Sequence, residues 1–137
     1  MEEEAQMNLD LFSAARRTRS KKYAIILANK DCLDDVLRTS TWFSMDGTFR
    51  IMPRPGNVLD VRASQVLLIT ADYHGKVVLL FSVIMTSRKI GLYRKVFKFL
   101  KTTFPNFKPP QMMSDYERSM RSAFRSIYPS TKLFGCR

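Results

Sequence analysis

The sequence predicts an α/β domain built on a mixed β-sheet. Three strand-like segments follow one another between residues 41 and 85, and helix and strand then alternate to the end of the 137-residue chain. Consecutive strands joined by loops favour an antiparallel meander, whereas strands that follow helical crossovers lie parallel to a neighbour. We therefore expect one domain with three antiparallel strands, then the order α-β-α-β, and helices packed on the faces of the sheet.

The first half of the chain is predicted to be rich in strands. The expected elements are a strand at 23–28, a short helix at 31–40, and strands at 41–51, 61–71 and 76–85. Aromatic and β-branched residues favour the strand at 41–51. The strand at 76–85 is almost continuously apolar, as is typical of a strand covered on both faces. The stretch PRPGN at 53–57 predicts a loop, and DYHG at 72–75 predicts a turn that ends at Gly75.

The second half changes to helical spacing. A helix is expected over 90–104, where apolar residues from Tyr93 to Phe104 recur on one stripe and Pro105 ends the helix. A short strand is expected at 111–116. It leads into a helix that carries Met120 and Phe124 and stops at Pro129. Residues 131–136 are expected to form a last strand.

Charge separates an N-terminal tail at 1–22 from the domain at 23–137. The chain carries a net charge of +11, although its first ten residues contain four acids and no base. A strongly basic domain favours a polyanionic partner, and nucleic acid comes first. No apolar run is long enough to span a membrane, so no membrane partner is expected. Five basic residues in the tail suggest a nuclear-import signal or a nucleic-acid arm, with a helix end or a solvated linker as the alternative: Arg16, Arg17, Arg19, Lys21 and Lys22.

Two aspartates are the candidate catalytic residues. Asp46 lies in the apolar stretch WFSMDGTFR, and Asp115 lies where QMMSDYE leaves a strand and enters a helix. Ser114 and Glu117 are spaced as a capping box, which predicts Asp115 in the first helical turn. If the two strands are neighbours, the carboxylates share one site and suit Mg²⁺ or Mn²⁺. The alternative is that Asp115 favours the helix N-terminus and Asp46 forms a turn with Gly47.

Basic residues near this pair would position a nucleic-acid backbone. Three share a side of the last helix, and four more lie on the preceding helix: Arg118, Arg121 and Arg125, then Arg94, Lys95, Lys98 and Lys101. Solvated helix faces are the alternative. Trp42 is interpreted as a core residue rather than a base-stacking platform. Two cysteines and one histidine are too few for a four-ligand zinc site.

The motifs resemble the transposase domain of Mutator-like elements, the MULE family. The resemblance rests on DGTF around Asp46, on DYE at the strand-to-helix junction and on a late GC, in the order STWFSMDGTFRIMP, SQVLLITADYHGKVVLLFSVIM and PPQMMSDYERSMRSAFRSIYPSTKLFGC. It covers about residues 22–136. It implies a ribonuclease-H-like fold and a DDE-type, metal-dependent site that cuts and joins DNA, with Asp46 and Asp115 as its first two acids.

The family's third acid has no counterpart here, because no Asp or Glu follows Glu117. The resemblance therefore implies an incomplete domain whose site a partner chain or oligomer would complete. Three hypotheses remain from the sequence, of which the simplest is a truncated gene product without a function of its own. Two of them assign a function. One is a nuclear transposase or transposase-derived fragment that is catalytically incomplete, and the other is a domesticated, non-catalytic nucleic-acid-binding or interaction module.

Overall fold

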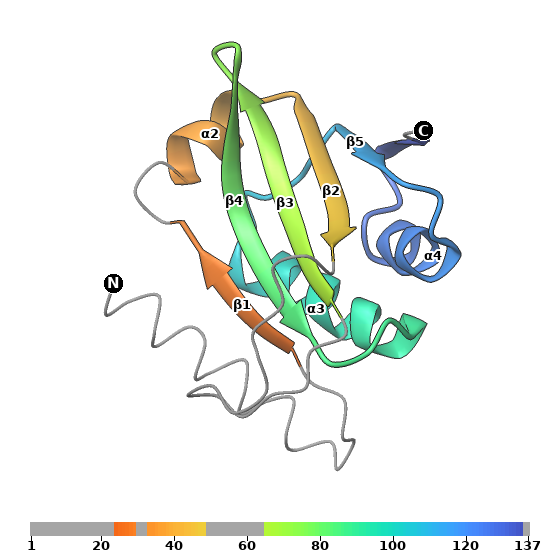
Figure 1. The fold of residues 1–137 in the computed structure, drawn as a ribbon. Helices are drawn as coiled ribbons and strands as arrows, with labels where there is room; N and C mark the ends of the chain where they lie inside the picture. The colour runs from red at the N-terminus through yellow and green to blue at the C-terminus, as the bar shows by residue number, and fades with distance from the viewer. Residues whose placement is uncertain (1–23, 30–32, 49–64, 136–137) are drawn as a thin grey trace.

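The computed structural model describes residues 24–29, 33–48 and 65–135 (Figure 1). In chain order the elements are β1 (Ala24–Ala28), α2 (Leu33–Thr39), β2 (Trp42–Thr48), β3 (Gln65–Tyr73), β4 (Lys76–Met85), α3 (Ile90–Thr103), β5 (Gln111–Ser114), α4 (Arg118–Ile127) and β6 (Lys132–Gly135). Each described element corresponds to one that the sequence predicts. The predicted α/β class is therefore confirmed. The tail at 1–22 and the loop at 53–57 lie outside the described residues.

The six strands form one mixed sheet with the order β1-β4-β3-β2-β5-β6. The predicted meander is confirmed, since β2 pairs antiparallel with β3 and β3 with β4. The two late strands extend the other side of β2, where β5 pairs parallel with β2 and β6 with β5. The first strand, β1, pairs antiparallel with β4 at the far edge. Segments distant in sequence therefore meet at the β2–β5 pair inside the sheet.

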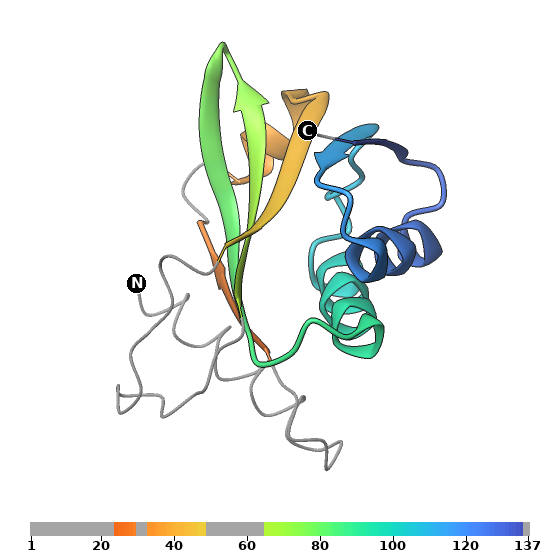
Figure 2. The same cartoon turned by 45° about the vertical axis from the view of Figure 1, so that its right-hand side comes forward.

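The two longer helices, α3 and α4, lie on the same side of the sheet (Figure 2). The predicted stripe on α3 is buried, with Tyr93, Val96 and Phe97 at 1% exposure or less. Phe124 of α4 meets the Phe97 ring edge-on, with ring centroids 5.2 Å apart. Helices were expected on the faces of the sheet, and both long ones cover a single face.

The strand β2 shows the difference between the two faces of the sheet. Phe43 and Met45 point into the core, whereas Trp42, Ser44 and Asp46 are exposed. This alternation follows from the two-residue period of a strand. The prediction of Trp42 as a core residue is therefore wrong, because its neighbour Phe43 occupies the inward position. We call the side opposite α3 and α4 the outer face.

The β3–β4 hairpin closes at His74 and Gly75, as the turn prediction requires. Their φ angles are 51° and 77°, so both residues adopt the left-handed region. Two consecutive residues with positive φ match the right-handed twist of the flanking strands. Glycine accepts this conformation without strain, which explains a glycine at position 75.

Among the described residues, no helix is long and apolar enough to cross a membrane.

Candidate functional site at the β2–β5 pair

The parallel pairing of β2 with β5 brings the two candidate aspartates to neighbouring positions, Asp46 within β2 and Asp115 directly after β5. The register runs from Trp42 opposite Gln111 to Met45 opposite Ser114. Asp46 is the next residue of β2, and Asp115 is the first residue after β5, so both lie just beyond that register. Asp46 is exposed and lies opposite Leu68 of β3 on its other side. The alternative in which Asp46 forms a turn with Gly47 is wrong, because β2 continues through both residues to Thr48.

Asp115 lies in the short link between β5 and α4. Its Oδ1 accepts a hydrogen bond of 3.1 Å from the backbone N–H of Glu117, which closes a local turn. The helix begins at Arg118, and its N-cap residue, Glu117, makes no side-chain cap hydrogen bond with any described residue. The predicted first-turn position of Asp115 is therefore wrong. The carboxylate still satisfies one backbone N–H at this end of the helix.

Ser114 does not form the predicted capping box with Glu117. It is the last residue of β5, and it is 1% exposed. Its Oγ donates to the carbonyl of Asp115 at 3.0 Å and accepts from Nη1 of Arg121 at 2.9 Å. Pairing with β2 holds Ser114 in the sheet, three residues before the helical N-terminus that it would have to cap.

The carboxylate of Glu117 belongs to a partly buried polar network. Its Oε1 accepts a hydrogen bond of 2.8 Å from the hydroxyl of Tyr93, and its Oε2 lies 3.3 Å from Nη2 of Arg88. The Tyr93 hydroxyl in turn accepts a hydrogen bond from Nε2 of Gln65. Burial raises the pKa of Tyr93, and the Glu117 carboxylate raises the pKa of Arg88. The network links β3, α3 and the start of α4, and it fixes the residue that holds Asp115.

Sequence reasoning missed this network. Tyr93 was assigned to the apolar stripe of α3, and its ring does lie there. A tyrosine predicted to be fully buried nevertheless needs a partner for its hydroxyl, and that requirement was a signal for a polar neighbour. The identity of the partners could not be predicted, because Gln65 and Glu117 are distant in sequence.

Gly47 makes room for the Gln65 side chain beside the site. A Cβ added at Gly47 would lie 2.3 Å from Oε1 of Gln65. Gln65 is 1% exposed and is held by Tyr93 and by Sδ of Met85, 3.5 Å from its Nε2. The glycine in the DGT sequence therefore has a packing role, in a strand rather than in a turn.

The candidate basic residues divide into exposed and structural groups. Arg118 and Arg125 of α4 are exposed, as are three residues of α3: Arg94, Lys95 and Lys98. Arg121 is half-buried, and it also donates to the carbonyl of Phe134 at 3.2 Å. Lys101 donates to the carbonyl of Ile127 at 2.8 Å, which ties α3 to the end of α4. The five bases of the tail lie outside the described residues.

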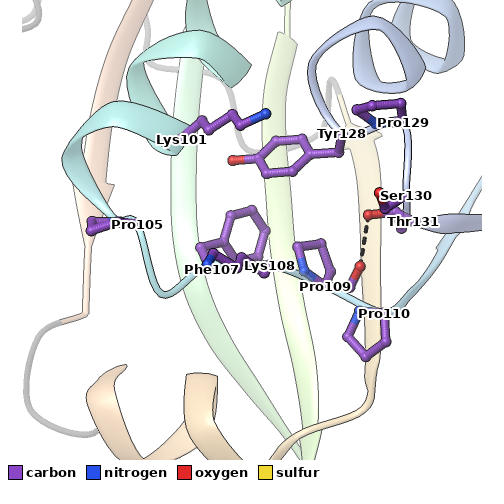
Figure 3. Close-up of a pocket in the computed structure, with 10 residues that line it drawn as sticks. All are labelled: Lys101, Pro105, Phe107, Lys108, Pro109, Pro110, Tyr128, Pro129, Ser130 and Thr131. Carbon is purple, nitrogen blue, oxygen red and sulfur yellow. Dashed lines mark hydrogen bonds between the residues drawn. The ribbon is translucent and has the colours of Figure 1, made fainter.

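A pocket of about 440 Å³ lies at the other end of β5 (Figure 3). It is lined by Lys101, Pro105, Phe107, Lys108, Pro109, Pro110, Tyr128, Pro129, Ser130 and Thr131. Thr131 closes one side by donating to the carbonyl of Pro109 at 2.6 Å. Prolines and aromatic rings form most of its walls, and neither candidate aspartate belongs to it.

The donor atoms at the β2–β5 pair suit a hard cation only in part. Two carboxylates are oxygen ligands of the kind that Mg²⁺ and Mn²⁺ accept, with water or phosphate oxygens completing the shell. In the part of the chain that the structure describes, no group of three or more acidic, histidine or cysteine side chains could hold a metal ion. The arrangement therefore offers two ligands, Asp46 and Asp115. The sequence matches no protein-family model and no curated protein.

Proposed function

We propose that this chain is a Mutator-like transposase or a fragment derived from one. Its parent chemistry would be metal-dependent cleavage and transfer of DNA strands in the nucleus. The observation that carries the proposal is the β2–β5 register, which brings Asp46 on β2 near Asp115 just after β5 from positions far apart in sequence. The strand order, a three-stranded meander extended by two parallel strands, is compatible with a ribonuclease-H-like fold.

In this proposal Asp46 and Asp115 would hold one Mg²⁺ or Mn²⁺ ion. The metal would supply charge stabilisation for a phosphoryl-transfer reaction. The Tyr93–Glu117–Arg88 contacts fix the backbone N–H that binds Asp115, so they orient that carboxylate. Residues 118–137 contain no acid, so in this proposal a third acid would come from outside these residues, as from a partner chain or oligomer.

Metal binding and strand cutting are measured separately to test this proposal. We expect weak Mn²⁺ binding in electron paramagnetic resonance titrations, and weaker binding in both Asp46→Asn and Asp115→Asn. Asp34→Asn, which changes an exposed acid on α2, is the matched control and should bind Mn²⁺ like the unmodified chain. In a nicking assay with Mg²⁺ or Mn²⁺ the chain alone should cut little DNA. Equal Mn²⁺ binding in all four proteins would refute the metal site.

The second candidate function is a non-catalytic nucleic-acid-binding module. The observation that favours it is the exposed basic surface of the helices, formed by Arg94, Lys95 and Lys98 on α3 and by Arg118 and Arg125 on α4. This function predicts DNA binding that weakens steeply with salt and persists in Asp46→Asn. The two candidate functions therefore differ in what Asp46→Asn changes. The transposase proposal predicts weaker Mn²⁺ binding, whereas the binding module requires no contribution from Asp46.

A further inference from the structure

Two large aromatic side chains lie exposed on the outer face beside the candidate site. Trp42 of β2 and Phe134 of β6 are each 38% exposed. Their ring centroids lie 5.3 Å apart, with the ring planes inclined at 41°. The strand β5 runs between them, with Gln111 opposite Trp42 and Met113 opposite Phe134. The two rings therefore bridge β5 and leave part of their surface to solvent.

The pair lies on the same face and the same strand as the candidate metal ligand. Trp42, Ser44 and Asp46 alternate with the inward residues of β2. Four residues along a strand span about 13 Å. A nucleic-acid segment that reaches Asp46 with a phosphate could therefore place a neighbouring base over the aromatic pair.

A lysine supplies positive charge beside the rings. Lys132 and Phe134 are exposed, whereas Leu133 between them packs against the core. Lys132 therefore projects on the same side of β6 as Phe134 and can neutralise a phosphate. Arg121 holds the strand in place by donating to the carbonyl of Phe134 and to Oγ of Ser114.

We propose that Trp42 and Phe134 form a stacking platform for an unpaired base of single-stranded DNA. This inference rests on the proposed function, and it names the form of the substrate. Exposed aromatic rings with an adjacent cation are the usual means of binding single strands, since every base has a face that can stack. The bases of a duplex are already stacked on one another, so the platform selects single-stranded over double-stranded DNA.

The sequence provides a direct probe, because Trp42 is the only tryptophan of the chain. Titration with a single-stranded oligothymidine should quench the tryptophan fluorescence. A blunt duplex of the same length should leave the fluorescence unchanged at concentrations where it binds by anisotropy. Equal quenching by both would overturn the proposal, as would binding of the single strand without quenching.

Substitution of the second ring separates stacking from non-specific contact. Phe134→Leu should weaken single-strand binding about tenfold or more, and duplex binding by much less. Leu79→Ala removes another exposed apolar side chain, 42% exposed on β4, and should leave both affinities unchanged. Unchanged single-strand affinity in Phe134→Leu, with the fold intact by circular dichroism, would overturn the platform.

Asp46→Asn distinguishes failure of the platform from failure of the metal site. We expect this variant to lose Mn²⁺ affinity while retaining the fluorescence quenching. Retained Mn²⁺ binding without any quenching by single strands would overturn the platform and leave the proposed function standing. Fluorescence that changes with protein concentration in the absence of DNA, together with dimers in ultracentrifugation, would instead assign the rings to contact between copies of this chain.

Discussion

At the scale of single residues, Gly47 links the candidate site to the buried core. Gly47→Ala should lower the free energy of unfolding by about 1–3 kcal/mol, because the new Cβ would displace the Gln65 side chain from Tyr93. Urea denaturation measures this loss. Gly91→Ala is the control. Apart from its chain neighbours and the backbone of its own helix, no described atom lies within 4 Å of a Cβ at Gly91, so the stability of this variant should not fall. Similar losses in both variants would contradict the packing role.

Loss of the hydroxyl group should have opposite effects on stability at two buried tyrosines. Tyr93→Phe should destabilise the protein by about 1–3 kcal/mol, because Gln65 and Glu117 lose a buried hydrogen-bond partner. Tyr128 is 6% exposed, and its hydroxyl has no partner among the described residues. Tyr128→Phe removes this unsatisfied group, so stability should stay the same or rise. Thermal unfolding measures the stability of both variants. An equal loss of stability in Tyr93→Phe and Tyr128→Phe would refute the prediction.

The sequence predicted individual residues unevenly. The inward positions of α3 followed from their spacing alone. The outward position of Trp42 did not, because an aromatic residue in an apolar segment is usually buried and only the strand period distinguishes it from Phe43. The Tyr93–Glu117 contact could not be predicted, since it depends on how α3 and the β5–α4 link meet in space.

At the scale of elements, the short helix α2 is held by the buried side chains of Leu33 and Val36 and by a hydrogen bond from the sheet. The Tyr73 hydroxyl of β3 donates to Oδ2 of Asp35, and this bond is the main reason that the pKa of Asp35 lies below its usual range. A carboxyl group whose pKa is lower in the folded state stabilises the protein above its unfolded pKa. That contribution is lost as the pH falls through the folded pKa.

Stability should therefore decline as the pH falls from about 5 towards the lowered pKa of Asp35, in part through this carboxyl group. Asp35→Asn should be less stable near neutral pH and should show a shallower decline over this range. Urea midpoints across the range measure the effect. Asp34→Asn, on the exposed side of the same helix, is the control and should follow the unmodified protein. An unchanged pH profile in Asp35→Asn would show that the bond contributes nothing.

The elements themselves were predicted more reliably than their ends. Period and proline positions located every described strand and helix. The start of α4 was predicted wrongly because the Ser-x-x-Glu spacing of a capping box also occurs where a strand runs on through the serine. Pairing of Ser114 with Met45 is a long-range contact, and no local signal reveals it.

At the scale of the whole molecule, the excess of positive charge should govern nucleic-acid binding. DNA affinity should fall steeply as salt increases, because each Lys or Arg that neutralises a phosphate releases a counterion from the DNA. Arg118→Ala and Arg125→Ala should each reduce the slope of log affinity against log salt by about one, if each contacts a phosphate. Fluorescence anisotropy at several salt concentrations gives the slopes. Arg38→Ala, on α2, is the control and should leave the slope unchanged. If Arg118→Ala and Arg125→Ala also left the slope unchanged, α4 would be excluded from the DNA interface.

The overall topology was predictable to the level of the meander and the parallel late strands. The position of β1 at the edge beside β4 was not predicted, because its sequence carries no information on which partner it pairs with. Local pattern and crossover rules also placed Asp46 and Asp115 on candidate neighbouring strands. Their actual adjacency depends on a register of four residue pairs that only the folded sheet reveals.

That register has a consequence for the order of assembly. The strands β2, β3 and β4 pair with their sequence neighbours, whereas β5 must close a long loop before it meets β2. The segment from β5 to β6 is thus suited to act as a separate opening unit. Under native conditions its amide protons should exchange faster than those of β3. The two aspartates would then come together last during folding and separate first during partial unfolding, so a ligand that bridges them would slow exchange in β5 before it affected the meander.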